Sequence, residues 1–178
     1  MAITLFGTPV LAQTYSSIIT DKEIYDFLNW LTKTEPKYAV EPGIIKQVSE
    51  HIVRWDTSNF IQKDTLNGHD HFYLYKSRGG TDTLFKKEDR DFLFLQYTSI
   101  KDSTWHQPFK RSAMLKQKLE TPNWHFYSVP LFSRNRDYVI VFKEYYCGPL
   151  CAYGGYYVYR KKGARKWERI TGVNTWIS

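Results

Sequence analysis

The spacing of apolar residues after the first twenty positions predicts an amphipathic helix. One apolar stripe is formed by Ile24, Phe27, Leu28 and Leu31, which stand at positions i, i+3, i+4 and i+7. Before this stripe, residues 20–23 read T-D-K-E, a capping box in which the Thr20 hydroxyl and the Glu23 carboxylate each bind a backbone N–H group. The helix is therefore expected to start at Thr20.

Two further helices are predicted by looser patterns. One begins at Pro42, a residue that suits a first helical turn, and carries Ile45, Val48, Ile52 and Trp55 at helical spacing. The other runs from about residue 86 to about residue 99, where the apolar residues follow the helical period less closely. The helices are thus expected in the first hundred residues.

From His125 onward the pattern predicts strands. The apolar segments become short, rich in aromatic and β-branched residues, and separated by turn residues or charges: 125–132, 137–146, 154–161 and 165–173. We expect an antiparallel meander with hairpin turns at 133–137 and 161–165, in which Asn135 and Gly163 take a positive φ. One more strand is expected at 71–77.

This order of elements predicts an α+β fold, with N-terminal helices packed on a C-terminal antiparallel β-sheet. The chain has 178 residues, a usual size for one domain, and we expect residues 13–178 to form it. Trp176, at the end of the meander, is expected to pack against the helices. No apolar run outside the N-terminus approaches the ~20 residues that span a bilayer, so we do not expect a membrane-spanning chain.

Residues 1–12 allow two interpretations. They carry no charge, and Val10-Leu11-Ala12 places small residues where a signal peptidase reads before a cleavage at Gln13, which indicates a remnant of a secretory signal. The first positive charge is Lys22, so the basic start of a signal is missing, and an ordinary N-terminal strand is the alternative. A signal remnant would mean a periplasmic or secreted protein.

Composition and charge indicate a contact face. Aromatic residues make up 17% of the chain and the formal net charge is +7, which favours anionic partners. The candidate binding residues are Arg134 and Arg136 on the first predicted turn, Lys161, Lys162 and Arg165 on the second, and Tyr157, Tyr159 and Trp167 beside them. Cations beside aromatic rings also bind single-stranded nucleic acid, but an exported protein would not meet it.

The last third of the chain resembles a group of small exported bacterial proteins. The shared motifs are P-x-F-S at 130–133, C-G-x-L-C at 147–151, a tryptophan near a basic turn at 167, and a W-I-S sequence at 176–178. Ala152 stands where that pattern has a glycine. The resemblance implies the fold class and export, and carries no implication for chemistry.

Cys147 and Cys151 are expected to form a local disulfide. A thioredoxin-type centre has two residues between its cysteines and a helix after the first, whereas here three residues intervene and a strand follows. A zinc site would need further ligands at suitable spacing, and the chain has no third cysteine. An exported protein can oxidise the pair, although two reduced thiols remain the alternative.

No catalytic residue, metal site or cofactor is predicted. His69 and His71 lie at the right spacing to share one side of a strand, but the sequence does not place a third ligand such as His106 or His125, and two surface histidines explain the pattern more simply. Nucleophile-elbow, zincin and phosphate-loop motifs are missing. We therefore expect an exported, non-catalytic binding module, such as an immunity-type protein that binds a protein or an anionic envelope partner. A small cell-envelope hydrolase or transferase, with its site between helices and sheet, is the alternative.

Overall fold

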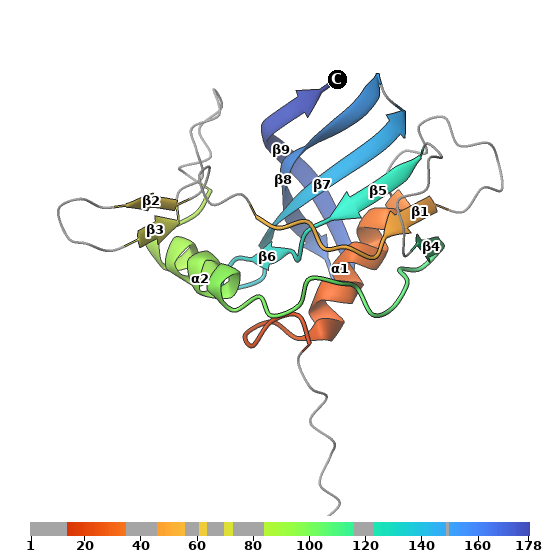
Figure 1. The fold of residues 1–178 in the computed structure, drawn as a ribbon. Coiled ribbons are helices and arrows are strands. Elements are labelled where there is room, and N and C mark those ends of the chain that lie inside the picture. Colours follow the sequence, from red (N-terminus) through yellow and green to blue (C-terminus); the bar gives the residue numbers. More distant parts are fainter. Residues whose placement is uncertain are drawn as a thin grey trace, which may run out of the picture.

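The structure is a computed structural model, and it describes residues 14–34, 46–55, 61–63, 70–72, 84–115, 123–148 and 150–178. Along this part of the chain the elements are α1 (Asp21–Thr34), β1 (Lys46–Ser49), β2 (Ile61–Lys63), β3 (Asp70–Phe72), α2 (Lys87–Thr98), β4 (Ser112–Leu115), β5 (Trp124–Tyr127), β6 (Leu131–Phe132), β7 (Tyr138–Gly148), β8 (Cys151–Gly163) and β9 (Lys166–Ile177). Figure 1 shows their arrangement.

The main sheet is mixed rather than purely antiparallel. Its order is β4-β1-β5-β7-β8-β9, with β6 pairing β7 beside this path. The strands β5, β7, β8 and β9 pair antiparallel, as predicted, but β1 runs parallel to both β4 and β5. The α+β class and the antiparallel C-terminal strands are confirmed. The prediction that the sheet consists only of the C-terminal antiparallel meander is wrong, because β1 and β4 also belong to it. A parallel pair needs a long connection, and α2 lies in the one between β1 and β5.

The helix predicted from Pro42 is wrong where the structure describes it. Residues 46–49 form strand β1 and residues 52–55 have no regular structure. Val48 and Ile52 are buried in the core that contains α1, whereas Trp55 is buried in the core that contains α2. An extended segment that is buried on both sides therefore produced an apolar spacing that resembles a helix.

The first helix begins as its sequence predicts. The Glu23 N–H donates to Thr20 Oγ1 and the Thr20 N–H donates to Glu23 Oε2, both over 3.2 Å, which completes the capping box. Its apolar stripe includes Phe27, which packs edge-on against the Tyr159 ring of β8 at 5.6 Å between centroids. The helix expected near residues 86–99 is also confirmed, as α2.

The two helices cover opposite faces of the central strands. Val139 and Val141 of β7 belong to the core cluster that contains α1, while Ile140 between them belongs to the cluster that contains Leu93 of α2. Because successive side chains of a strand point to opposite faces, α1 and α2 lie on different sides of the sheet. Helical and strand elements thus form three layers around β7 and β8.

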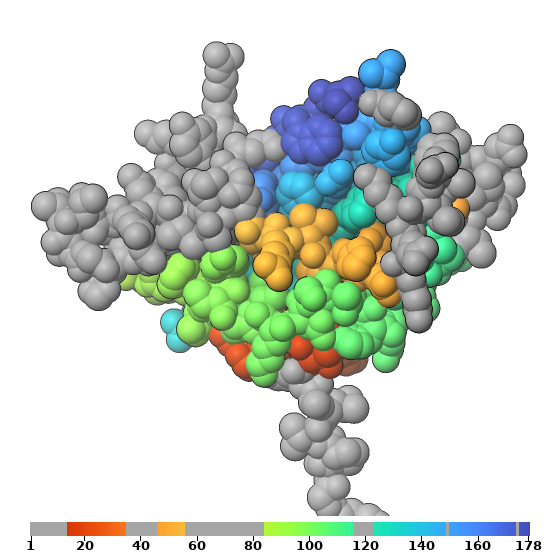
Figure 2. Space-filling view, viewed as in Figure 1, coloured from red at the N-terminus to blue at the C-terminus, as the bar shows by residue number. Residues whose placement is uncertain are grey.

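The sheet extends beyond both helices at one end. In Figure 1 the upper ends of β7, β8 and β9 stand clear of α1 and α2, with the C-terminus among them. Figure 2 shows the same strands, in blue and violet, at the top of this face, above segment 46–55 in orange. We call this part of the sheet, residues 143–148, 150–155 and 169–177, its open end.

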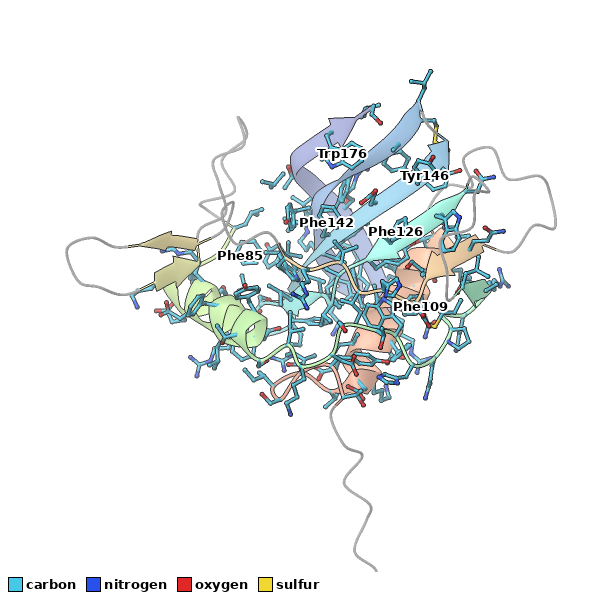
Figure 3. The ribbon with its side chains drawn as sticks, in the orientation of Figure 1. Phe85, Phe109, Phe126, Phe142, Tyr146 and Trp176 are labelled. Atoms are coloured by element: carbon cyan, nitrogen blue, oxygen red, sulfur yellow. A yellow bond between two sulfur atoms is a disulfide. The ribbon has the colours of Figure 1, made fainter. Side chains whose placement is uncertain are left out.

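Trp176 lies at the open end and does not pack against the helices, so that prediction is wrong (Figure 3). Its side chain is 40% exposed, and its indole lies over Gly154, where a Cβ atom would come within 2.9 Å of the ring. Strand β9 runs away from α1 over its second half, which carries Trp176 past the end of the core. The contact requires glycine at position 154.

Both hairpin turns form where predicted, but neither uses the expected residue for a positive φ. At residues 133–137 it is Arg136 that has φ of 65°, while Asn135 accepts a hydrogen bond from the Asp137 N–H through its side chain. In the second turn Gly163 pairs with Lys166, and its φ is not positive. The strand predicted at 71–77 begins as β3, and its remainder, like residues 1–12, lies outside the described residues.

Candidate functional site

A cavity of about 740 Å³ lies at the open end of the sheet, and its lining residues come from β7, β8 and β9. It is lined by Lys143, Tyr145, Cys147, Cys151, Tyr153, Tyr157, Arg169, Ile170, Thr171, Gly172, Thr175, Trp176 and Ile177. Tyr157 also belongs to the core cluster that contains α1, so the cavity lies on the α1 side of the sheet, past the end of the helix. We call it the open-end cavity.

Tyrosine rings form one wall of the open-end cavity. Tyr145 and Tyr153 face each other across β7 and β8, with 5.3 Å between ring centroids. The Tyr145 ring also lies 4.7 Å from the imidazole of His125, and its hydroxyl donates to Asn123 Oδ1 over 2.5 Å. Burial raises the pKa of Tyr145, so its hydroxyl stays neutral. The hydrogen bond to Asn123 fixes the position of the ring.

Two cations lie against the third tyrosine. Lys143 Nζ is 4.5 Å from the centroid of the Tyr157 ring, and Arg169 Cζ is 5.8 Å from the same centroid. Both distances are in the range of cation–π attraction. Lys143 is only 8% exposed, whereas Arg169 is exposed, so positive charge lines both the inner and the outer part of the cavity.

The predicted disulfide is confirmed, and both of its cysteines line the open-end cavity. Cys147 and Cys151 are bonded, with 5.0 Å between their Cα atoms, and the bond is visible in yellow at the hairpin tip in Figure 3. The strands continue to Gly148 and resume at Cys151, which pair with each other. The bridge therefore clamps two strand ends, whereas the sequence had suggested a longer loop that ends near Gly155.

Close packing at Gly172 shapes the third strand of the site. A Cβ atom at this position would lie 2.7 Å from the Thr175 methyl carbon and 3.4 Å from the Tyr157 ring. Gly172 pairs directly with Tyr157. A larger residue here would require the Thr175 side chain to move.

Of the aromatic residues predicted for binding, the structure brings only Tyr157 into the open-end cavity. Tyr159 is buried against Phe27 and Trp30 of α1, at 5.6 and 5.7 Å between centroids. Trp167 packs against Phe27 at 5.4 Å. Both rings attach α1 to the sheet.

The predicted basic residues lie at the opposite end of the strands from the cavity. Arg136 pairs with Glu23 over 3.0 Å, and Lys162 pairs with Glu168 over 2.9 Å. The Arg134 N–H donates to Asp89, Lys161 Nζ lies 5.9 Å from the Trp167 centroid, and Arg165 is exposed in the turn between β8 and β9. Sequence reasoning did not select Lys143, Tyr145 or Tyr153, whereas Arg169 belongs to the same basic stretch of sequence as Lys161, Lys162 and Arg165. Side chains alternate between the two faces along β7, so residues 143, 145 and 147 share one face. This pattern could have pointed to Lys143 and Tyr145.

A second cavity, of about 540 Å³, lies between the end of α2 and segment 52–55 and is lined in part by Asp102. Asp102 Oδ2 lies 2.7 Å from His106 Nε2. The hydrogen bond from His106, together with backbone N–H groups, holds the pKa of Asp102 below its usual range. This is a carboxylate–imidazole pair on the surface, next to a cavity of moderate size.

Two findings limit the classes of site in the described part of the chain. No cluster of three or more His, Cys, Asp or Glu side chains there is arranged to hold a metal ion. Neither α1 nor α2, the helices of the described segments, has the length and apolarity required to cross a membrane.

Comparison of the chain with protein-family models, with curated proteins and with solved structures gives no match.

Proposed function

We propose that this protein is an exported, non-catalytic binding module and that the open-end cavity is its binding site. The observation that carries the proposal is the chemistry of the lining: three tyrosines, a lysine and an arginine, with no carboxylate or imidazole side chain among the described residues that form it. General acid–base catalysis needs a group that titrates near the working pH, and these side chains do not supply one. They are suited to holding a ligand.

A protein partner agrees with the surroundings of the cavity. Ile177 is 89% exposed at its rim and Leu150 is 92% exposed at the hairpin tip, so a partner that covers the open end would bury both side chains. Tyrosine, tryptophan and arginine are also the residues that contribute most binding energy at protein interfaces. We favour an immunity-type role, in which the open end covers part of a toxin.

Export is supported by the disulfide. Structural disulfides persist in the periplasm and outside the cell, and are rare in reducing compartments. The proposed partner is therefore a toxin that is neutralised in the periplasm or outside the cell.

The proposal is tested by capture from an envelope extract with the oxidised protein as bait. The informative variant is Arg169→Glu, which reverses an exposed charge at the cavity, and Arg165→Glu is its matched control in the turn between β8 and β9. We expect the same partner on the wild type and on Arg165→Glu, and its loss from Arg169→Glu. Equal capture by all three proteins would show that the cavity is not the binding site.

One observation favours the alternative of a cell-envelope hydrolase or transferase. The Asp102–His106 pair beside the second cavity is the kind of oriented imidazole that acts as a general base. Turnover of purified envelope polymer that is lost in His106→Gln and kept in Arg169→Glu would establish that function in place of binding. Absence of turnover by the wild type would exclude the hydrolase or transferase alternative.

A further inference from the structure

We propose that the open-end cavity takes an apolar carboxylate, with its hydrocarbon body against Tyr145 and Tyr153 and its carboxylate at Arg169. This inference rests on the proposed function, because it names the ligand class of the same site. The carboxylate can come from a free organic acid or from the end of a partner's polypeptide chain, and both present the same chemistry to the cavity.

The apolar part of the inference follows from the walls. The paired rings of Tyr145 and Tyr153, the disulfide, and the side chains of Ile170 and Ile177 form the apolar part of the lining. Its volume of about 740 Å³ is in the range of sites for small organic ligands, roughly 300–1,000 Å³.

The anionic part of the inference follows from Arg169. Within the described residues this guanidinium makes no ion pair, whereas Arg160 and Lys162 on the neighbouring strand share the carboxylate of Glu168, at 3.1 and 2.9 Å. A guanidinium binds a carboxylate through two parallel hydrogen bonds. The Tyr157 ring lies beneath Arg169 and restricts its motion, which reduces the entropy lost when an anion binds.

Lys143 strengthens the preference for an anion. Its Nζ lies 4.5 Å from the centroid of the Tyr157 ring that also carries Arg169, so the two cations lie on neighbouring parts of one wall. An apolar ligand without a charge would leave this end of the cavity unused.

The test compares two probes that differ only in charge. Phenylpropionate and phenylpropionamide share one apolar body, and each is titrated by calorimetry into the oxidised full chain. We expect the acid to bind about tenfold more tightly than the amide, in line with a charge-assisted hydrogen bond. Arg169→Gln should greatly reduce this difference, leaving only the contribution of Lys143, and Arg165→Gln, the control on the turn, should keep it.

Two further probes distinguish the sources of the carboxylate. The peptide acetyl-Gly-Gly-Phe is compared as a free acid and as an amide: tighter binding of the peptide acid than of phenylpropionate supports a chain end, and the reverse order supports a free organic acid. Equal affinity of acid and amide, or an unchanged preference in Arg169→Gln, would overturn the inference. Failure of all four probes would also overturn it, while capture of a partner that depends on Arg169 would leave the proposed function standing.

Discussion

Arg136 Nε donates a hydrogen bond to Glu23 Oε1 over 3.0 Å and thereby joins residues that are 113 positions apart. Glu23 is in the capping box of α1, and Arg136 is in the turn between β6 and β7. The guanidinium carbon of the same arginine also lies 5.2 Å from the ring centroid of Phe92 in α2. One side chain from a hairpin turn therefore contacts both helices.

Replacing Arg136 with Gln should lower the free energy of unfolding by about 1 kcal/mol, because it removes a partly exposed ion pair together with the contact to Phe92. For a domain of this size that corresponds to a fall in melting temperature of roughly 2–4 °C. Thermal unfolding followed by circular dichroism measures it. Lys22→Gln, which breaks the exposed Lys22–Asp26 pair, is the control and should change the melting temperature less. Equal falls in melting temperature for the two variants would show that the Arg136–Glu23 pair stabilises the fold no more than an exposed ion pair does.

The Glu23 carboxyl should also make stability depend on pH. Partial burial raises the pKa of Glu23, but hydrogen bonds from Arg136 and Thr20 outweigh it and hold the pKa below its usual range. A carboxyl whose pKa is lowered by folding stabilises the folded state above its unfolded pKa of about 4.3, and this contribution is lost as the pH falls through the folded value. Chemical denaturation at about pH 6 and about pH 3 should therefore show a smaller difference for Glu23→Gln than for the wild type. Asp102, whose pKa is also lowered, should leave a residual slope in the variant. An unchanged difference would exclude Glu23 as a source of acid sensitivity.

The parts of the fold that follow from the sequence are those specified by near neighbours in the chain. The capping box at Thr20 places the start of α1, and runs of aromatic and β-branched residues place β7, β8 and β9. The disulfide likewise joins cysteines only four positions apart. In each case the residues that form the structure are close in sequence, so a local pattern contains the information.

The parts that did not follow depend on register between distant strands. Val48 was assigned to a helix because its burial in a parallel strand, beside β5, cannot be read from its neighbours. Lys143 and Arg169 meet at Tyr157 only because β7, β8 and β9 pair in one particular register. Conversely, Arg136 and Lys162 stood out as cations in turns, but acidic partners elsewhere in the chain occupy them.

Gln96 is a further position at which tertiary contacts decide the role of a residue. Its side chain is 1% exposed: Nε2 donates to the Phe132 carbonyl over 2.6 Å, and Oε1 accepts from the Phe132 N–H over 2.8 Å. Replacement with Ala should cost about 2–4 kcal/mol, because both backbone groups of Phe132 would lose a partner in the core. Urea denaturation measures the loss.

Gln107→Ala, at an exposed position, is the matched control and should cost less than about 0.5 kcal/mol. Similar free energies of unfolding for the two variants would mean that water replaces Gln96 without penalty. A large loss for Gln96→Ala alone would confirm that this side chain attaches α2 to β6.

The disulfide should stabilise the hairpin tip more than the whole fold. Cys147 and Cys151 enclose a very short loop and lie at the open end, away from both core clusters, so their bond restricts few conformations of the unfolded chain. Replacing both with Ser should cost about 1–2 kcal/mol and lower the melting temperature by only a few degrees. Intact-mass analysis of periplasmically expressed protein, alkylated without reductant, should detect no added alkyl group, and treatment with reductant should allow two. Because both cysteines line the open-end cavity, the double variant should also bind phenylpropionate more weakly than the wild type. Uptake of alkyl groups before reduction would show that the exported protein holds free thiols, and the assignment of this pair as a structural clamp would then be wrong.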